Sequence, residues 1–488
     1  MRVRGRETPP APLQAAAGTR VWYSTVPVKA PSTMDVGSET ETAAISPSVI
    51  DTLQQSISLQ MQAIADRVDA MLSPSERHRR TAVKLCVRTW NVCATPPPSC
   101  DQLRALLRTP RRRARAADAV EQDDDAAVGE GELNGDVYAI ALQEVVDING
   151  FGAYAGHMAY SAFGGGDAAV DGLNDGVMDE VLRWQHLLFE VLSGYKLVAR
   201  KALVGMTIFV FVRFEHLPFC NARVSALGTG PLGLGNKGAV AVSLQLYGSS
   251  LCLVGVHLAS GTSGTLARNE DVGRLHERLR FPDARTIPGL VVRPPGPATI
   301  GEHEFVVWLG DMNYRIRMAD EGVRRAMTAT PPPLAELAAA DELRFERLAG
   351  RVFAGYEEAP LLFAPTYKYD RGTDVYDTSH KKRAPAWCDR ILWRESELVA
   401  LVSYGRCEQL KSSDHRPVTA DLELYVAHEP SRASGTRVPA SEHAGTRLIG
   451  VLRMGPPSSL LQCFTACLGV ADTGQPEPGW SRKPPRAA

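Results

Sequence analysis

Polar side chains suited to phosphate chemistry lie at one end of several apolar runs in the sequence. Taken singly, each has an ordinary structural reading, since a histidine after a strand is commonly a core residue and Asp-x-Asn is commonly a turn. A buried charge is costly unless it is paired or bound to a metal ion. Their joint occurrence therefore predicts a functional site at one edge of a sheet, built from Asn91, Gln143, Glu144, His257, Asp311, Asn313, Asp389, Asp414 and His415.

The residue types indicate which chemistry this site would perform. Asn91, Glu144, Asp311 and Asp414 offer hard oxygen ligands, which suit Mg²⁺ better than zinc. The histidines and asparagines can donate hydrogen bonds to phosphate oxygens. The sequence contains no G-x-S-x-G motif, so no covalent nucleophile is indicated. This set of residues favours metal-assisted attack of water on a phosphoester.

These residues need a scaffold that brings distant parts of the chain together. Short β-rich runs alternate with stretches of helical periodicity at 174–192 and 267–280, which is an α/β pattern. The predicted strands are Val83–Asn91, Val137–Glu144, Met206–Arg213, Ala239–Leu246, Leu251–His257, Glu304–Leu309, Arg390–Trp393 and Pro417–Tyr425.

The flanking segments have a different composition. Residues 1–46 are rich in Pro, Ala, Ser and Thr and are predicted to be a disordered arm, and residues 427–488 a disordered tail. Residues 47–73 have the apolar spacing of an amphipathic helix, which would pack on the domain or, as an alternative, bind a membrane or partner. The catalytic domain is expected at 83–426.

Composition excludes some classes of protein. Of 488 residues, 44% are hydrophobic and 22% charged, and the formal net charge of −1 argues against a generally basic nucleic-acid binder. The nine cysteines form no C-x-x-C pair, and no apolar run reaches the roughly 18 residues of a membrane-spanning helix. We expect a cytoplasmic protein, with an organelle transit peptide as the alternative for the arginine-rich N-terminus.

Several longer motifs occur in a characteristic order. The chain resembles the inositol polyphosphate 5-phosphatases, within the superfamily of deoxyribonuclease I-like endonucleases, exonucleases and phosphatases. The resemblance covers about residues 83–426 and implies an α/β (α+β) fold, a four-layer sandwich of two packed mixed β-sheets flanked by helices. It is carried by Thr89-Trp-Asn-Val, Leu142-Gln-Glu, Gly235-Asn-Lys-Gly, His257-Leu-Ala, Trp308-Leu-Gly-Asp-Met-Asn-Tyr-Arg-Ile, Pro365-Thr-Tyr-Lys-Tyr, Tyr376-Asp-Thr-Ser, Arg383-Ala-Pro-Ala-Trp-Cys-Asp-Arg-Ile-Leu and Ser413-Asp-His-Arg-Pro-Val.

The resemblance also implies roles for the metal-side residues. Asn91 and Glu144 resemble the Mg²⁺ ligands, with Asp414 nearby. Asp311 resembles the residue that orients or deprotonates the attacking water. The family usually continues Asn-Val with Asn-Gly, whereas Cys93 and Ala94 follow here. That difference changes a neighbour of a metal ligand and not the ligand itself.

A second group of roles concerns the scissile phosphate. Asn313 resembles a residue that contacts this phosphate, and His257 and His415 resemble phosphate-binding groups. Asp389 resembles the acidic partner that orients His415, which would fix the tautomer of the imidazole.

Substrate selection is expected from a separate group of residues. Cations and a phenol hydroxyl form charge-assisted hydrogen bonds with a phosphate dianion. For residues 381–383, the alternative interpretation to phosphate binding is a run of charged side chains exposed to solvent. Gly228-x-Gly230-x-x-Gly233 matches a dinucleotide fingerprint, but no acidic residue follows at the expected distance, so NAD binding is rejected. Tyr367, Lys368, Lys381 and Arg383 match residues that hold a neighbouring 4-phosphate, and Asn236 and Lys237 match a head-group contact.

Together these features predict Mg²⁺-dependent hydrolysis of the 5-phosphate of phosphatidylinositol 4,5-bisphosphate and related phosphoinositides or inositol polyphosphates. The expected partners are the substrate and, transiently, a membrane surface that Leu203 and Val204 could touch; nucleic acid is not expected. The location would be cytoplasmic and peripheral to membranes. The alternatives are a nuclease of the same superfamily and a catalytically inactive phosphoinositide-binding scaffold.

Overall fold

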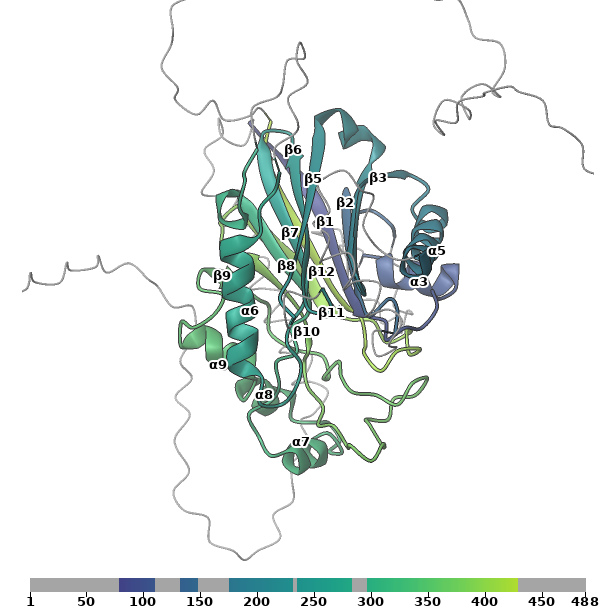
Figure 1. The fold of residues 1–488 in the computed structure, drawn as a ribbon, viewed down its shortest axis with the longest axis vertical. Helices are drawn as coiled ribbons and strands as arrows, with labels where there is room; N and C mark the ends of the chain where they lie inside the picture. Colours follow the sequence, from purple (N-terminus) through teal and green to yellow (C-terminus); the bar gives the residue numbers. More distant parts are fainter. Residues whose placement is uncertain (1–78, 110–131, 148–174, 231–234, 283–295, 429–488) are drawn as a thin grey trace, which may run out of the picture. The chain divides into compact units, whose positions relative to one another are not determined.

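The computed structural model describes residues 79–109, 132–147, 175–230, 235–282 and 296–428, all within the first of two compact units, Met1–Ser431 (Figure 1). Two mixed six-stranded sheets form the centre of this described part. The first sheet has the order β11–β12–β1–β2–β4–β3. Its strands are β1 (Arg80–Asn91), β2 (Val137–Gln143), β3 (Tyr195–Leu203), β4 (Met206–Arg213), β11 (Val399–Arg406) and β12 (Val418–Ala427).

The second sheet has the order β5–β6–β7–β8–β10–β9. In each sheet one pair of neighbouring strands is parallel, β1 with β2 and β7 with β8, and the other pairs are antiparallel. Its strands are β5 (Cys220–Gly228), β6 (Gly238–Leu246), β7 (Ser249–His257), β8 (Phe305–Asp311), β9 (Tyr356–Glu357) and β10 (Asp389–Arg394).

The two sheets pack face to face through alternate side chains of their strands. Val87 and Val210 of the first sheet and Val242, Leu253 and Leu309 of the second are fully buried in one hydrophobic core. Because the side chains of a strand alternate between its two faces, the intervening residues cover the outer faces and need helices above them. This arrangement gives the four layers that the sequence predicts.

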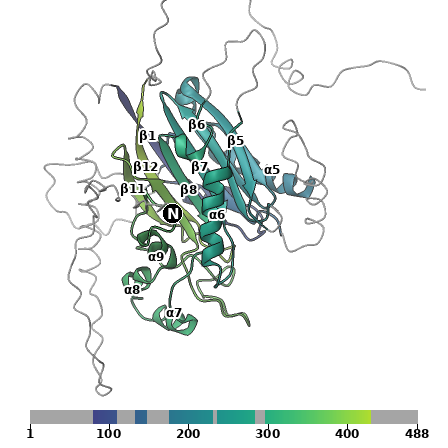
Figure 2. The same ribbon diagram turned by 60° about the vertical axis from the view of Figure 1, so that its left-hand side comes forward.

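Helices cover both outer faces. On the first sheet, α5 places Trp184 edge-on to Trp90 of β1, with ring centroids 5.9 Å apart. On the second sheet, α6 lies along the strands, and its Leu275 joins the core that contains Trp308 of β8 (Figures 1 and 2). The described helices are α3 (Cys100–Leu107), α5 (Asp175–Val191), α6 (Thr265–Arg278), α7 (Asp320–Ala326), α8 (Leu334–Ala339) and α9 (Glu342–Leu348), with the 3₁₀ helices η1 (Phe214–Phe219) and η3 (Ile300–Glu302).

The eight predicted strands and the helices predicted at 174–192 and 267–280 are present, with ends that differ by a few residues. The prediction for β2 was one residue too long, since Glu144 has a φ of +52° and leaves the strand. Four strands, β3, β5, β9 and β11, were not predicted; each occupies a sheet edge and is only partly buried, so its apolar pattern is weak. The predicted arm at 1–46, helix at 47–73 and nearly all of the tail at 427–488 lie outside the described residues.

Candidate active site

The register of the second sheet places three of the predicted site residues side by side. His257 pairs with Asp311 across the parallel β7–β8 ladder, and Asp311 pairs with Asp389 across the antiparallel β8–β10 ladder. His257 Nε2 lies 3.3 Å from Asp311 Oδ2. The three side chains therefore form a row across one end of the sheet, where all of them are buried.

The first sheet supplies the opposite side of the site. Asn91, the last residue of β1, pairs with Gln143 at the end of β2, and Glu144 follows directly. Asn91 Nδ2 donates a hydrogen bond of 3.0 Å to Asp311 Oδ2, which joins the two sheets at the site. Glu144 Oε1 lies 3.7 Å from His257 Nε2. Gln143 is oriented differently, because its side-chain amide donates to Thr89 Oγ1 at 3.1 Å.

Unusual backbone conformations at and beside the site residues set the directions of their side chains. Gly310 precedes Asp311 with a φ of +152°, and a Cβ at this position would lie 2.0 Å from the carbonyl oxygen of Val256. A larger residue would therefore force β7 and β8 apart beside the site. Glu144 and Asn313 also have positive φ values, of 52° and 58°. Non-glycine residues in this region of backbone space are uncommon and cluster at functional sites.

Cationic neighbours keep Asp311 ionised despite its burial. Burial alone would raise the pKa of this carboxyl, but the hydrogen bond with His257 and the positive charge of His415 hold the pKa well below its usual range. His415 Nε2 is 4.0 Å from Asp311 Oδ2. A carboxylate with so low a pKa accepts hydrogen bonds well but is a weak proton acceptor.

Asp389 holds His415 in a fixed orientation. His415 Nδ1 lies 2.8 Å from Asp389 Oδ2, and Thr366 Oγ1 donates to the same oxygen at 2.7 Å. Burial alone would lower the pKa of His415, but the charge of Asp389 and the hydrogen bond to it raise this pKa to about 9. At neutral pH the imidazole is therefore positively charged, with Nε2 directed at Asp311.

The oxygen donors on the metal side fit a divalent cation. The Glu144 carboxylate is partly exposed and accepts no hydrogen bond from any described residue. Asp414 is paired with Lys368, whose Nζ donates to Oδ2 at 2.7 Å. Burial alone would raise the pKa of Asp414, but His415 and Lys368 lower it. Asp414 is thus held as a charged oxygen donor, and carboxylate groups such as these can hold a divalent metal ion.

Lys237 reaches the site from the loop before β6, and Asn236 precedes it in the same loop. Lys237 Nζ is within hydrogen-bond distance of His257 Nε2. Burial is the main cause that lowers the pKa of Lys237, and the charges of Asp311 and Glu144 oppose it. Asn236 Oδ1 is buried and has no hydrogen-bond partner within the described structure. The structure thus brings Lys237 to the predicted catalytic residues.

The four residues assigned to a 4-phosphate do not form one contact group. Tyr367 lies against His415, with ring centroids 4.6 Å apart, and the neighbouring Lys368 contacts Asp414. Lys381 is exposed and Arg383 half-buried. Among the described residues, neither of these two side chains bonds to the catalytic candidates. Their loop is joined to Lys368 through the Asp377 N–H, which donates to the Lys368 carbonyl at 2.9 Å.

Arg315 was not predicted as a site residue, although it lies in the same motif as Asp311 and Asn313. Its Nη2 donates to Asn313 Oδ1 at 2.8 Å, and its guanidinium carbon lies 4.7 Å from the centre of the Tyr367 ring. Arg315 therefore bridges the residue expected at the scissile phosphate and a residue expected at the 4-phosphate. The signal in the sequence was a charged residue two positions after Asn313.

The chain is similar to known phosphatases over most of the described region. The family model of Endonuclease/Exonuclease/phosphatase family 2 matches residues 88–421. Type II inositol 1,4,5-trisphosphate 5-phosphatase of Mus musculus is 39% identical over 236 residues, which cover 48% of this chain and 23% of that protein. Synaptojanin-1 of Homo sapiens is 34% identical over 332 residues, which cover 61% of this chain and 19% of that protein.

A plant relative and a crystal structure show the same similarity to inositol polyphosphate 5-phosphatases. Type I inositol polyphosphate 5-phosphatase 5 of Arabidopsis thaliana is 40% identical over 242 residues, covering 48% of this chain and 44% of that protein. The chain spans less than half the length of each of these relatives. The inositol polyphosphate 5-phosphatase domain of SPsynaptojanin, crystallised with inositol (1,4)-bisphosphate and a calcium ion, superposes with a TM-score of 0.54 at 28% identity, covering 75% of this chain and 92% of that one. The chain belongs to Endonuclease/Exonuclease/phosphatase family 2, and its most similar parts match inositol polyphosphate 5-phosphatases.

Proposed function

We propose that this chain hydrolyses the 5-phosphate of phosphatidylinositol 4,5-bisphosphate and related phosphoinositides or inositol polyphosphates, with Mg²⁺ as the metal ion. The observation that carries the proposal is the position of Asp311. This ionised carboxylate lies close to one hydrogen-bond donor from each sheet, Asn91 from the first sheet and His257 from the second. The similarity to named 5-phosphatases supports the substrate class.

Asn91, Glu144 and Asp414 would hold the Mg²⁺ ion through side-chain oxygens. The bound ion would supply positive charge that offsets the negative charge developing on the phosphate oxygens. The protein's own contribution includes keeping the Asp414 carboxylate ionised. Burial alone would raise the pKa of Asp414, but the charge of His415 and the pairing with Lys368 lower it.

Asp311 would accept a hydrogen bond from the attacking water and orient it toward phosphorus. Its depressed pKa favours this orienting role over removal of a proton in the ground state. The orientation of the carboxylate is fixed because Asn91 Nδ2 donates to Oδ2 and the Asn313 N–H donates to Oδ1 at 3.1 Å. A fixed carboxylate reduces the entropy that must be lost when water is aligned.

Three side chains would bind the scissile phosphate. His415 would donate from Nε2 as an imidazolium, since its pKa is raised to about 9. His257 would contribute from the neighbouring strand. Asn313 would donate from its side-chain amide, whose nitrogen now donates to the Leu258 carbonyl at 3.2 Å and whose oxygen accepts from Arg315. Donors already in place stabilise the transition state without reorganisation.

The 4-phosphate would be held by a second set of residues. Tyr367 lies beside His415, so a phosphate bound there would be adjacent to the one hydrolysed. Lys381 and Arg383 would approach from the loop that is bonded to Lys368. Lys237 would contact the head group from the opposite side, with Asn236, whose buried Oδ1 has no partner among the described residues.

We further propose that the enzyme acts in the cytoplasm at membrane surfaces. The described helices include none with the length and apolar content needed to span a bilayer. Leu203 ends β3 and Val204 begins the turn to β4; both are partly exposed, so this end of the hairpin would be the contact with lipid. The lipid substrate would then be reached from the membrane surface.

A substrate panel tests the proposal. Purified full-length chain with Mg²⁺ would be given phosphatidylinositol 4,5-bisphosphate vesicles, soluble inositol 1,4,5-trisphosphate, phosphatidylinositol 4-phosphate vesicles and a DNA duplex. We expect phosphate release from the first two, with the 4-phosphate retained in the product. Release from phosphatidylinositol 4-phosphate at the same rate, or cleavage of DNA alone, would overturn the assignment.

A further inference from the structure

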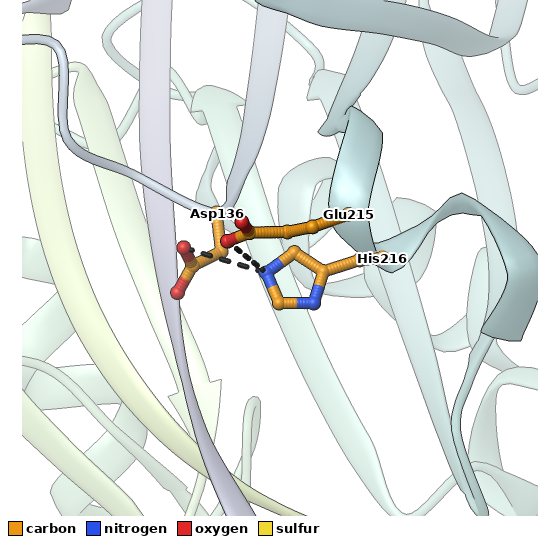
Figure 3. A group of neighbouring side chains, drawn as sticks. All are labelled: Asp136, Glu215 and His216. Carbon is orange, nitrogen blue, oxygen red and sulfur yellow. Dashed lines mark ion pairs between the residues drawn. The ribbon is translucent and has the colours of Figure 1, made fainter.

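A second cluster of metal-binding residue types lies at the other end of the first sheet. Asp136 immediately precedes β2, whereas Glu144 of the candidate active site follows the same strand. At about 3.3 Å per residue, the seven residues of β2 separate the two ends by roughly 23 Å. Glu215 and His216 join Asp136 from η1, the 3₁₀ helix that follows β4 (Figure 3). The cluster therefore belongs to a different part of the molecule from the proposed hydrolytic chemistry.

The His216 ring is fixed with one nitrogen directed at both carboxylates. Its Nδ1 lies 2.8 Å from the Tyr247 hydroxyl. Its Nε2 lies 3.5 Å from Asp136 Oδ1 and 3.5 Å from Glu215 Oε1 (Figure 3). The side chain is only 9% exposed, and Nε2 has no hydrogen-bond partner in the described chain. A buried nitrogen without a hydrogen bond, aimed at two carboxylate oxygens, points to a ligand that all three atoms could share.

The spacing fits one small divalent ion. Zinc binds imidazole nitrogen and carboxylate oxygen at about 2.0–2.2 Å, so tetrahedral ligand atoms lie roughly 3.3–3.5 Å apart. All three candidate atoms lie within 4.8 Å of one another. We propose that Asp136 Oδ1, Glu215 Oε1 and His216 Nε2 form a Zn²⁺ site. The mixture of one imidazole and two carboxylates suits zinc better than Mg²⁺, which prefers oxygen ligands alone.

Neighbouring groups hold the proposed ligands in place. The Lys84 N–H donates to Asp136 Oδ2 at 2.8 Å, which leaves Oδ1 facing His216. The Tyr247 hydroxyl likewise holds the His216 imidazole in place through its contact with Nδ1. Hydrogen bonds of this kind orient metal ligands in known sites. Glu215 is 62% exposed, so its carboxylate can move onto the ion and a water molecule can complete the coordination.

Arg213 competes with the metal ion for the same oxygens. Its Nη1 lies 3.7 Å from Asp136 Oδ1 and 3.8 Å from Glu215 Oε1. These distances exceed the hydrogen-bond range, and Nη2 is engaged elsewhere, donating to the Gly135 carbonyl at 2.9 Å. The guanidinium partly neutralises the carboxylates, so zinc binds more weakly here than at a cysteine-rich structural site.

Zinc titration of the full chain tests the site. Isothermal titration calorimetry at neutral pH, with excess Mg²⁺ present to occupy the candidate active site, would compare wild type with Glu215→Gln and His216→Gln. His186→Gln replaces an exposed histidine of α5 and is the matched control. We expect wild type and His186→Gln to bind one more equivalent of zinc than the other two variants. Equal stoichiometry in all four proteins would overturn the proposal.

Cobalt provides a second readout that does not depend on stoichiometry. Co²⁺ in a four-coordinate site absorbs visible light more strongly than hydrated Co²⁺. We expect such absorption in wild type and its loss in Glu215→Gln, an exposed position where folding is not at risk. Absorption that persists in Glu215→Gln and His216→Gln would place the bound ion elsewhere and contradict the site.

Discussion

Asn91 and Asp311 belong to different sheets, and the hydrogen bond between Asn91 Nδ2 and Asp311 Oδ2 measures 3.0 Å. This contact joins the ends of β1 and β8, the central strands from which the candidate active site is built. It also links the proposed metal side of the site to the residue proposed to orient water.

Replacing Asp311 by Asn should reduce turnover by about 10²–10⁴-fold, because it removes the charged group proposed to orient the attacking water. The amide has nearly the same shape, so the circular dichroism spectrum should not change. Asp101→Asn removes an exposed carboxylate and is the control. Turnover within a few-fold of wild type would reject the role given to Asp311.

Arg315 should act through Asn313. Arg315→Gln removes a charged donor to Asn313 Oδ1 and should lower kcat about tenfold to hundredfold, since such a bond contributes about 1.5–3 kcal/mol. Arg315→Lys keeps the charge but loses the planar geometry, so it should recover activity only in part. Arg317→Lys, an exposed neighbour, is the control. A change in KM alone would mean that Arg315 only binds substrate.

Lys381 should affect only substrates that carry a 4-phosphate. Lys381→Ala should lower kcat/KM for those substrates about fivefold, corresponding to about 1 kcal/mol for an exposed charge pair. Lys382→Ala, at an equally exposed position, should have little effect. Equal losses for inositol phosphates with and without a 4-phosphate would show that the pocket is wrongly assigned.

Lys368 should behave differently from Lys381, because its ammonium group also pairs with Asp414. Lys368→Ala leaves that carboxylate without its partner. The rate should therefore fall for all substrates, and the Mg²⁺ concentration needed for half-maximal rate should change. A purely 4-phosphate-dependent loss would show that the ion pair with Asp414 is unimportant for catalysis.

The rate should depend on the protonation of His415. Because the pKa of His415 is raised to about 9, the imidazolium predominates at neutral pH and the rate should fall as pH rises through about 9. Asp389→Asn removes the main partner that raises this pKa, so the fall should move toward the unperturbed value of about 6.5. A pH profile unchanged by Asp389→Asn would contradict the assignment.

The same raised pKa affects stability with a definite sign. The folded state of His415 binds its proton more tightly than the unfolded state, so the contribution to stability is fully present below about pH 6.5. This contribution should be lost as pH rises through about 9. Urea unfolding at several pH values would measure the slope in wild type and in Asp389→Asn.

The sequence predicts those parts of the fold whose local pattern agrees with their burial. The central strands are apolar throughout and were identified, whereas the half-buried edge strand β5 was not. The approach of His257 to Asp311 depends on the parallel pairing of β7 with β8, which no local pattern specifies. The polar residues at the strand ends predict a shared sheet edge, but not which strands pair there.

Other parts of the site could not be predicted for a related reason. The role of Arg315 depends on where its guanidinium points, toward Asn313 and over Tyr367, which lies far along the chain. The cluster of Asp136 with His216 likewise requires the turn after β4 to return to the start of β2. Such juxtapositions follow from tertiary packing and leave no periodic signal in the sequence.

The metal dependence of 5-phosphate release tests the central claim most directly. Metal-stripped wild type and Glu144→Gln would be titrated with Mg²⁺ while phosphate release from inositol 1,4,5-trisphosphate is followed. We predict that stripped wild type is inactive and recovers fully with Mg²⁺, and that Glu144→Gln needs a much higher Mg²⁺ concentration. Full activity in the metal-stripped protein, or identical Mg²⁺ titrations for the two proteins, would contradict the account.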